Sequence, residues 1–87
     1  MYEVRLTERS QKELDKLPKD ISKNIFIRIS LLTFPFPSGL NISKLSGLRD
    51  YYRLRVGKIR VIFVVFHETK KIIIRKIAYR KDVYRFS

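Results

Sequence analysis

The alternation of hydrophobic and polar positions predicts a short strand at the start of the chain. Residues 2–6 read "YEVRL", and Tyr2, Val4 and Leu6 fall on one side of an extended segment. This period of two then gives way to a helical period, so the strand is expected to end near Leu6.

Two helices are predicted between residues 8 and 33. Thr7 is a suitable N-cap for a helix over residues 8–17, which Pro18 ends. From Pro18 to about residue 33, apolar residues recur every three or four positions, which predicts a second helix with a buried stripe. The stripe consists of Ile21, Ile25, Ile29 and Leu32. We expect the two helices to form a hairpin around Pro18.

The second half of the chain predicts a sheet. The sequence "FPFPSGL" ends the second helix, and the segment up to Leu48 is predicted to be a loop. Three strands then follow, over about residues 50–56, 59–66 and 71–78. Gly57-Lys58 and "HETKK" are predicted to be turns, which makes these strands an antiparallel meander. The 87 residues therefore predict a single α+β domain, 1–87, with one twisted sheet and two helices packed on one of its faces.

The period of two also separates the two faces of the predicted sheet. Tyr52, Leu54 and Val56 are expected to point toward the helices, and the alternate residues of that strand to point away from them. The alternate residues are Tyr51, Arg53 and Arg55. On the next strand, Arg60 shares a face with the apolar residues Ile62, Val64 and Phe66. We therefore expect basic side chains to gather on the helix-free face, near one end of the sheet.

Charge is the strongest feature of the composition. The formal net charge is +12, with 8 basic and 5 acidic residues before Arg49 but 12 basic and 3 acidic residues from Arg49 onward. Such a concentration of positive charge in a folded domain predicts a polyanionic partner, most simply nucleic acid. The chain has no cysteine, no apolar run of about 20 residues and no signal-peptide pattern. These features predict a soluble cytoplasmic protein without a membrane partner.

The chain resembles the RelE/ParE superfamily of toxin–antitoxin toxins. The resemblance rests on "KLSGLRDYYRLRVGKIRVIF", on "IAYRKDVY", and on the order of strand, helical hairpin, loop and strands. It implies a compact fold with two helices on a twisted antiparallel sheet. For RelE-like members it further implies a toxin that cleaves mRNA in the ribosomal A site without metal or cofactor. Such a toxin is held inactive in a hetero-oligomer by an antitoxin, here one with an acidic, amphipathic segment.

The resemblance also implies a set of catalytic residues. The family's basic and tyrosine positions correspond to Arg53, Arg55, Arg60, Arg80 and Tyr84. The best-studied pattern has lysine where this chain has Arg53 and Arg55, and many relatives have histidine where it has Tyr79. We assign RNA binding to five further residues: Tyr51, Lys58, Tyr79, Lys81 and Arg85.

The chemistry of RNA cleavage fits most of these residues. Attack by a 2′-hydroxyl needs a proton acceptor, stabilisation of the phosphorane and a proton donor for the leaving oxygen. Arginine grips phosphate with two hydrogen bonds but stays protonated, so Arg53 and Arg55 are poor bases. Nearby cations favour the ionised form of a tyrosine, which makes Tyr84 the predicted base, with Tyr51 and Tyr79 as substitutes. The few scattered acids of this half, Asp50, Glu68 and Asp82, do not predict a metal site.

Two other functions remain open from the sequence. ParE-like members of the superfamily inhibit DNA gyrase without the catalytic residues. A degenerate toxin would only bind RNA or an antitoxin through its cationic surface. Binding alone would give a steep dependence on salt and no cleaved product.

Overall fold

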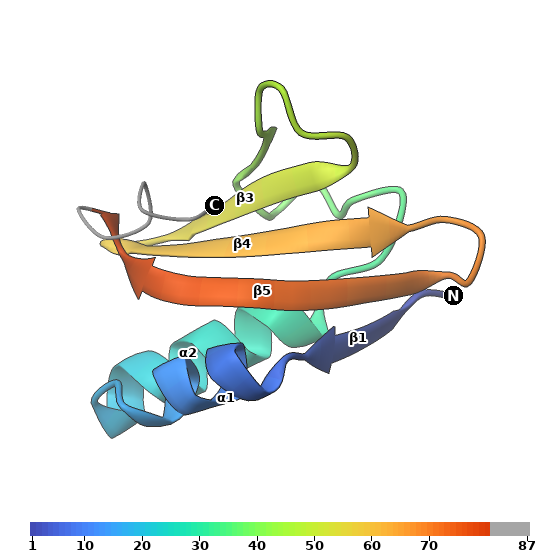
Figure 1. Ribbon diagram of the computed structural model, residues 1–87. Coiled ribbons are helices and arrows are strands. Elements are labelled where there is room, and N and C mark those ends of the chain that lie inside the picture. Colours follow the sequence, from blue (N-terminus) through green and yellow to red (C-terminus); the bar gives the residue numbers. More distant parts are fainter. Residues whose placement is uncertain (81–87) are drawn as a thin grey trace.

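The protein forms one five-stranded sheet with two helices on one face. The computed structural model describes residues 1–80, and the strands lie side by side in the order β1-β5-β4-β3-β2 (Figure 1). The elements are β1 (Glu3–Leu6), α1 (Glu8–Asp15), α2 (Lys19–Ser30), β2 (Ile42–Lys44), β3 (Tyr51–Val56), β4 (Ile59–Phe66) and β5 (Lys71–Tyr79). The predicted α+β class is confirmed.

The helical hairpin forms for the predicted reasons, but both helices are shorter than predicted. The Thr7 Oγ1 accepts a hydrogen bond from the Ser10 backbone N–H at 3.1 Å and so caps α1. Pro18 is the N-cap of α2. The last turn of α2 tightens, because the N–H of Leu31 and the N–H of Leu32 each bond to a carbonyl three residues back. The helix therefore ends at Ser30 rather than near residue 33.

Strands β3, β4 and β5 form the predicted antiparallel meander. A two-residue turn joins Val56 to Ile59, and its first residue, Gly57, has a φ of +58°. Glycine reaches this left-handed region without the steric cost that a side chain brings. Strand β1 pairs in parallel with β5, with Glu3 opposite Lys71 and Leu6 opposite Ile74. The first and last strands of the described chain are thus neighbours.

The loop predicted before Leu48 contains an additional strand, and this part of the prediction is wrong. Strand β2 pairs antiparallel with β3, with Ile42 opposite Leu54 and Lys44 opposite Tyr52. Three residues are too few to give a readable period. The open edge of β3 supplies the N–H and C=O groups that hold this segment extended.

The core lies between the helices and the sheet. The α1 residue Leu14 and the predicted stripe on α2 pack against side chains of β3, β4 and β5, while Ile21 of that stripe is only half-buried. The fully or nearly fully buried core residues include Ile25, Ile29, Leu54, Val61, Phe63, Val65, Ile72 and Ile74. Tyr2, Val4 and Leu6 pack against this cluster, as the alternation of β1 predicted.

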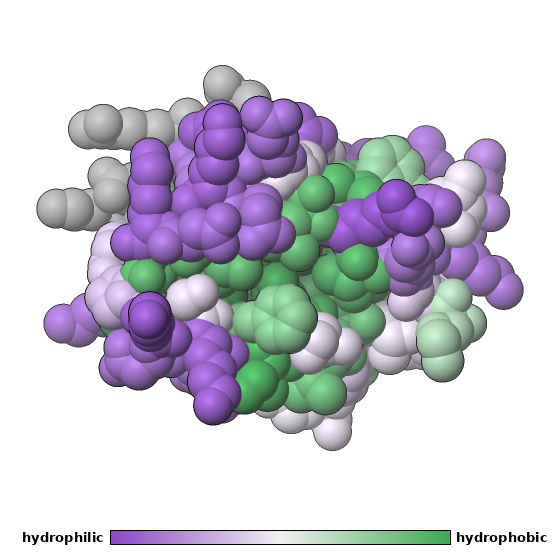
Figure 2. Space-filling view, turned by 90° about the horizontal axis from the view of Figure 1, so that it is seen from below, coloured by the Kyte–Doolittle hydropathy of each residue, from purple (hydrophilic) through white to green (hydrophobic). Residues whose placement is uncertain are grey.

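The helical side of the molecule also exposes hydrophobic surface. Phe26, Ile27 and Leu31 of α2 and its C-cap are exposed, and Figure 2 shows hydrophobic side chains across the middle of the side seen from below. In the described part, 1–80, neither helix has the length and hydropathy that crossing a bilayer requires.

Candidate functional site

A pocket of about 540 Å³ lies where the β3–β4 turn meets the end of β5. Its lining is basic and aromatic, and it consists of Arg55, Gly57, Lys58, Arg60, Tyr79 and Arg80. The backbone itself joins these segments, because the Arg80 N–H donates to the Lys58 carbonyl at 3.1 Å. The pocket brings together five of the predicted site residues, although the first and the last of them, Arg55 and Arg80, are 25 positions apart in the sequence.

Arg60 is the most buried cation of the pocket. Its side chain lies opposite Arg55 on β3, and only 6% of its surface is exposed. The Nη1 group donates to the carbonyls of Gly57 (2.9 Å) and Ile59 (3.2 Å). These two bonds fix the guanidinium beside the turn, so Arg60 holds the pocket's wall as well as contributing charge to it.

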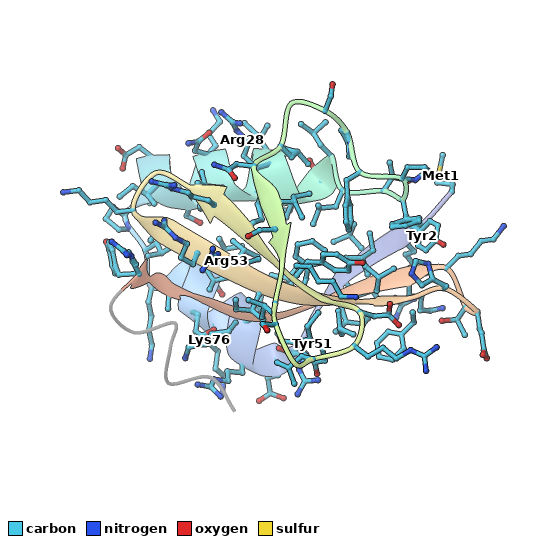
Figure 3. The ribbon with its side chains drawn as sticks, turned by 90° about the horizontal axis from the view of Figure 1, so that it is seen from above. Met1, Tyr2, Arg28, Tyr51, Arg53 and Lys76 are labelled. Carbon is cyan, nitrogen blue, oxygen red and sulfur yellow. The ribbon has the colours of Figure 1, made fainter. Side chains whose placement is uncertain are left out.

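Arg53 and Tyr51 share the helix-free face with this pocket but do not line it. Arg53 lies opposite Ile62, two residue pairs further along the sheet than Arg55 and Arg60. Its Nη2 donates to the Ser43 Oγ on β2 at 3.3 Å. Tyr51 lies two more pairs along, opposite Val64. Figure 3 labels both Arg53 and Tyr51. The predicted basic face is confirmed, while the predicted convergence holds for Arg55, Arg60 and Arg80 but leaves Arg53 to the side.

Two further cations on β5, which the sequence analysis did not single out, belong to the helix-free face. A bulge between Ile62 and Phe63 of β4 shifts the pairing with β5, so that Lys76 lies opposite Ile62. The Arg75 Nη1 donates to the Tyr51 hydroxyl at 3.0 Å. A strict period of two from Ile72 and Ile74 would have turned Lys76 toward the helices. The signal was the spacing of the buried isoleucines, which changes from two to three before Ile77.

Lys76 is held by the first helix. Its Nζ lies 3.5 Å from the Glu13 Oε2, and the Glu13 Oε1 accepts a hydrogen bond from the Ile77 backbone N–H at 2.8 Å. Strand β1 ends opposite Ile74, so the carboxylate occupies the edge of β5 beyond the last β1 pair. Glu13 therefore satisfies the sheet edge and neutralises a nearby lysine.

Three predicted site residues lie outside the described residues: Tyr84, Lys81 and Arg85. The roles assigned to them stay predictions. Within residues 1–80, Tyr79 is the tyrosine that lines the pocket, and it is partly exposed.

The described side chains fit an anion better than a metal ion. Residues 1–80 contain no cluster of three or more His, Cys, Asp or Glu side chains placed to hold a metal. Four basic side chains line the pocket without a carboxylate among its lining residues. Guanidinium and ammonium groups placed in this way can bind a phosphate and stabilise the additional negative charge of a phosphorane.

Comparison with known proteins now gives the family. Residues 4–84 match the family model described as the ParE toxin of the type II toxin–antitoxin system parDE. The chain belongs to the RelE/ParE toxin family. A curated protein of Methanocaldococcus jannaschii that carries the name RelE1 is 37% identical over 86 residues, which is 97% of this toxin and 96% of the relative.

Solved structures agree with this assignment. The RelE–RelB complex from Pyrococcus horikoshii contains a chain that is 34% identical, with a TM-score of 0.73 over 91% of this toxin and 94% of that chain. The isolated E. coli RelE toxin has a TM-score of 0.74 over 98% of this toxin and 93% of its own chain. That second protein is 22% identical, and the likeness concerns the fold.

Proposed function

We propose that this toxin is a metal-independent endoribonuclease that cleaves ribosome-bound mRNA and thereby inhibits translation in the cytoplasm. The observation that carries the proposal is the gathering of Arg55, Lys58, Arg60 and Arg80 around one pocket. A gyrase inhibitor without chemistry does not need a pocket lined by four cations. The relatives that carry the name RelE support the same choice.

The proposed reaction uses the RNA's own nucleophile. The 2′-hydroxyl attacks the adjacent phosphorus, a new O–P bond forms, and the bond to the 5′-oxygen of the next nucleotide breaks. The 2′-proton goes to a base, and the leaving oxygen takes a proton from an acid, so the products are a 2′,3′-cyclic phosphate and a 5′-hydroxyl. Arg55 and Arg80 are assigned to the phosphorane oxygens, while Arg60, fixed by the turn carbonyls, supplies charge beside them.

The assignment of the base follows the sequence prediction. We assign the proton acceptor to Tyr84 and keep Tyr79, which lines the pocket, as the substitute. Arg53 joins the catalytic group as an RNA phosphate ligand two residue pairs away from the Arg55–Arg60 pair of the pocket. Because the site holds no side chain that readily accepts a proton at neutral pH, we expect it to cleave free RNA slowly. Slow cleavage of free RNA fits a toxin that acts on RNA already bent by the ribosome.

The partner that restrains the toxin is proposed to be an antitoxin with an acidic, amphipathic segment. The P. horikoshii and M. jannaschii relatives were solved as RelE–RelB complexes. Here the concentration of positive charge after Arg49 favours an acidic partner, and the exposed Phe26, Ile27 and Leu31 favour one with an apolar side.

The test is a cell-free translation reaction in which the 5′ ends of the mRNA are mapped by primer extension. Wild-type toxin should produce cuts within translated codons, and Arg80→Ala should lower the rate by roughly 100-fold or more because a donor to the phosphorane is lost. Arg80 is exposed, so urea unfolding of the variant should match that of the wild type. A matched control is Arg28→Ala, which removes a cation from α2.

One observation favours a second function. The matching family model carries the ParE name, and ParE-like members of the superfamily inhibit gyrase. A supercoiling assay on the same preparation separates the two functions. Intact mRNA together with blocked supercoiling would assign the toxin to gyrase, and silence in both assays would leave a surface that only binds.

A further inference from the structure

The helix-free face carries an apolar row that the proposed chemistry does not use. Along β4 the side chains on this face are Arg60, Ile62, Val64 and Phe66. A sheet face that no helix covers usually carries polar side chains that point toward water. Here Ile62 and Val64 are nearly fully buried, and Phe66 at the end of the row is 48% exposed.

Basic side chains border this row on both neighbouring strands. Arg53 and Arg55 lie beside it on β3, at the residue pairs of Ile62 and Arg60. On β5, Lys76 lies at the pair of Ile62 and Lys71 at the pair of Phe66, but Lys76 is buried against Glu13 and Lys71 is paired with Glu3. The cationic border of this face is therefore formed by Arg53 and Arg55 on β3, and the apolar row beside them leads away from the pocket.

A tyrosine and an arginine cross the apolar row about halfway along its length. The hydrogen bond from the Arg75 Nη1 to the Tyr51 hydroxyl runs from β5 to β3, and β4 lies between those strands. The pair crosses the sheet at Val64, which is opposite Tyr51. It brings an aromatic ring and a cation together on the way from the pocket to Phe66.

The far end of the row differs in chemistry from the pocket. A hollow of about 370 Å³ there is lined by Arg49, Asp50, Val65, Phe66, His67, Glu68 and Thr69. Arg49 lies 3.6 Å from the Asp50 carboxylate, and Lys71 lies 3.7 Å from the Glu3 carboxylate, so the cations at this end are paired. Paired charges, carboxylates and an exposed ring suit the edge and face of a nucleobase better than a phosphate.

We infer that the helix-free face binds a single RNA strand that runs from the cationic pocket along β4, and that Phe66 stacks on a base several nucleotides away from the cleaved linkage. Phe66 lies six positions after Arg60, and a strand rises about 3.3 Å per residue, so the track is roughly 20 Å long. The arginines of β3 hold the backbone and aromatic side chains stack the bases, as in surfaces that bind single strands. The inference rests on the proposed function and adds to it an extended substrate site.

The experiment measures binding of RNA with a 2′-deoxy nucleotide at the cleaved linkage, which removes the attacking hydroxyl. Fluorescence anisotropy at fixed salt compares a trinucleotide with a heptanucleotide. Wild-type toxin should bind the longer strand more tightly by roughly tenfold or more, and Phe66→Ala should abolish that gain while leaving the trinucleotide unaffected. Phe66→Tyr keeps a ring and should keep the gain.

The matched control is Phe26→Ala, which removes an exposed phenylalanine from the helical side and should change neither affinity. Replacing one base of the heptanucleotide at a time by an abasic residue locates the stacked base. An abasic residue at one distant position should lower the affinity of wild-type toxin roughly tenfold and leave the affinity of Phe66→Ala unchanged. An abasic cost that persists in Phe66→Ala, or equal binding of the two variants, would overturn the inference.

The translation reaction keeps the two proposals apart. If wild-type toxin cuts translated mRNA but gains nothing from the longer strand, the extended site is wrong and the nuclease stands. If wild-type toxin makes no cuts, the proposed function fails whatever the oligonucleotides show. If an acidic helical peptide binds in a way that requires Phe66 while RNA does not, the far end is a protein-binding surface and the inference is again overturned.

Discussion

The two faces of the sheet come from alternate residues of the same strands, yet they are built for different purposes. Toward the helices, β4 presents Val61, Phe63 and Val65, which are buried in one continuous core. Away from the helices, the same strand presents Arg60 at one end and the exposed Phe66 at the other. One face gains its free energy from burial, and the other holds like charges close together at a cost in free energy.

The difference teaches where the chain tolerates change. On the helical face a smaller side chain leaves a cavity, and its cost appears in the free energy of unfolding. On the helix-free face the exposed side chains are proposed to contact RNA, so their loss is expected to appear in binding or rate. Loss of Arg60 should affect both stability and activity, because it is buried, its Nη1 donates to the Gly57 and Ile59 carbonyls, and it lines the pocket.

The sharpest test of this comparison uses two phenylalanines of β4. Phe63 is fully buried on the helical face, and Phe63→Ala should lower the free energy of unfolding by about 3–5 kcal/mol in urea titrations. Phe66→Ala, on the other face, should lower it by about 1 kcal/mol or less. Equal losses for the two variants would contradict the division of the sheet into a core face and a binding face.

The second test addresses the edge where the faces meet. Glu13→Ala removes both the acceptor of the Ile77 N–H and the partner of Lys76, and it should cost about 2 kcal/mol of unfolding free energy. Glu13→Gln keeps an acceptor oxygen but loses the charge, so its cost should be about half as large.

The control for the second test is Glu8→Gln, which removes a highly exposed ion pair with Lys12 and should have no measurable effect. If Glu13→Gln cost as much as Glu13→Ala, the hydrogen bond to the edge of β5 would contribute nothing. Thermal and urea unfolding would both report the difference.

The smallest expected effect concerns salt. Lys58 lines the pocket and is exposed, so Lys58→Ala should leave stability unchanged and weaken RNA binding for every sequence alike. The slope of log K against log salt should decrease by about 1, because one phosphate contact is lost. The matched variant Lys19→Ala on α2 should leave the slope as it is, and a slope that changes equally in both would disprove a localised contact.

Much of the fold could be predicted because local signals and tertiary packing agree. Thr7 and Pro18 mark the helix starts, and Gly57 marks the hairpin. The missed strand Ile42–Lys44 has no signal of its own and forms because β3 offers it an edge. The parallel pairing of β1 with β5 joins segments about 70 residues apart, which no local pattern encodes.

The candidate site was predictable only as far as the alternation of the strands is regular. Arg55 and Arg60 follow the period of two and lie on the helix-free face near one end of the sheet, as expected, and the structure places them opposite each other. On β5 the bulge interrupts the period, so Arg75 and Lys76 were missed even though both are plain in the sequence. Tyr84, Lys81 and Arg85 lie outside residues 1–80, so their roles stay predictions.

The place of β5 between β1 and β4 also sets the order in which a growing chain can become a toxin. Until Lys71–Tyr79 has been synthesised, β1 has no strand to pair with, Phe63 and Val65 lack their neighbours Ile74 and Ile72, and the pocket lacks Arg80. A nascent chain that ends before β5 therefore has neither a complete core nor a complete site. Strand β5 thus completes the core and the cationic pocket together.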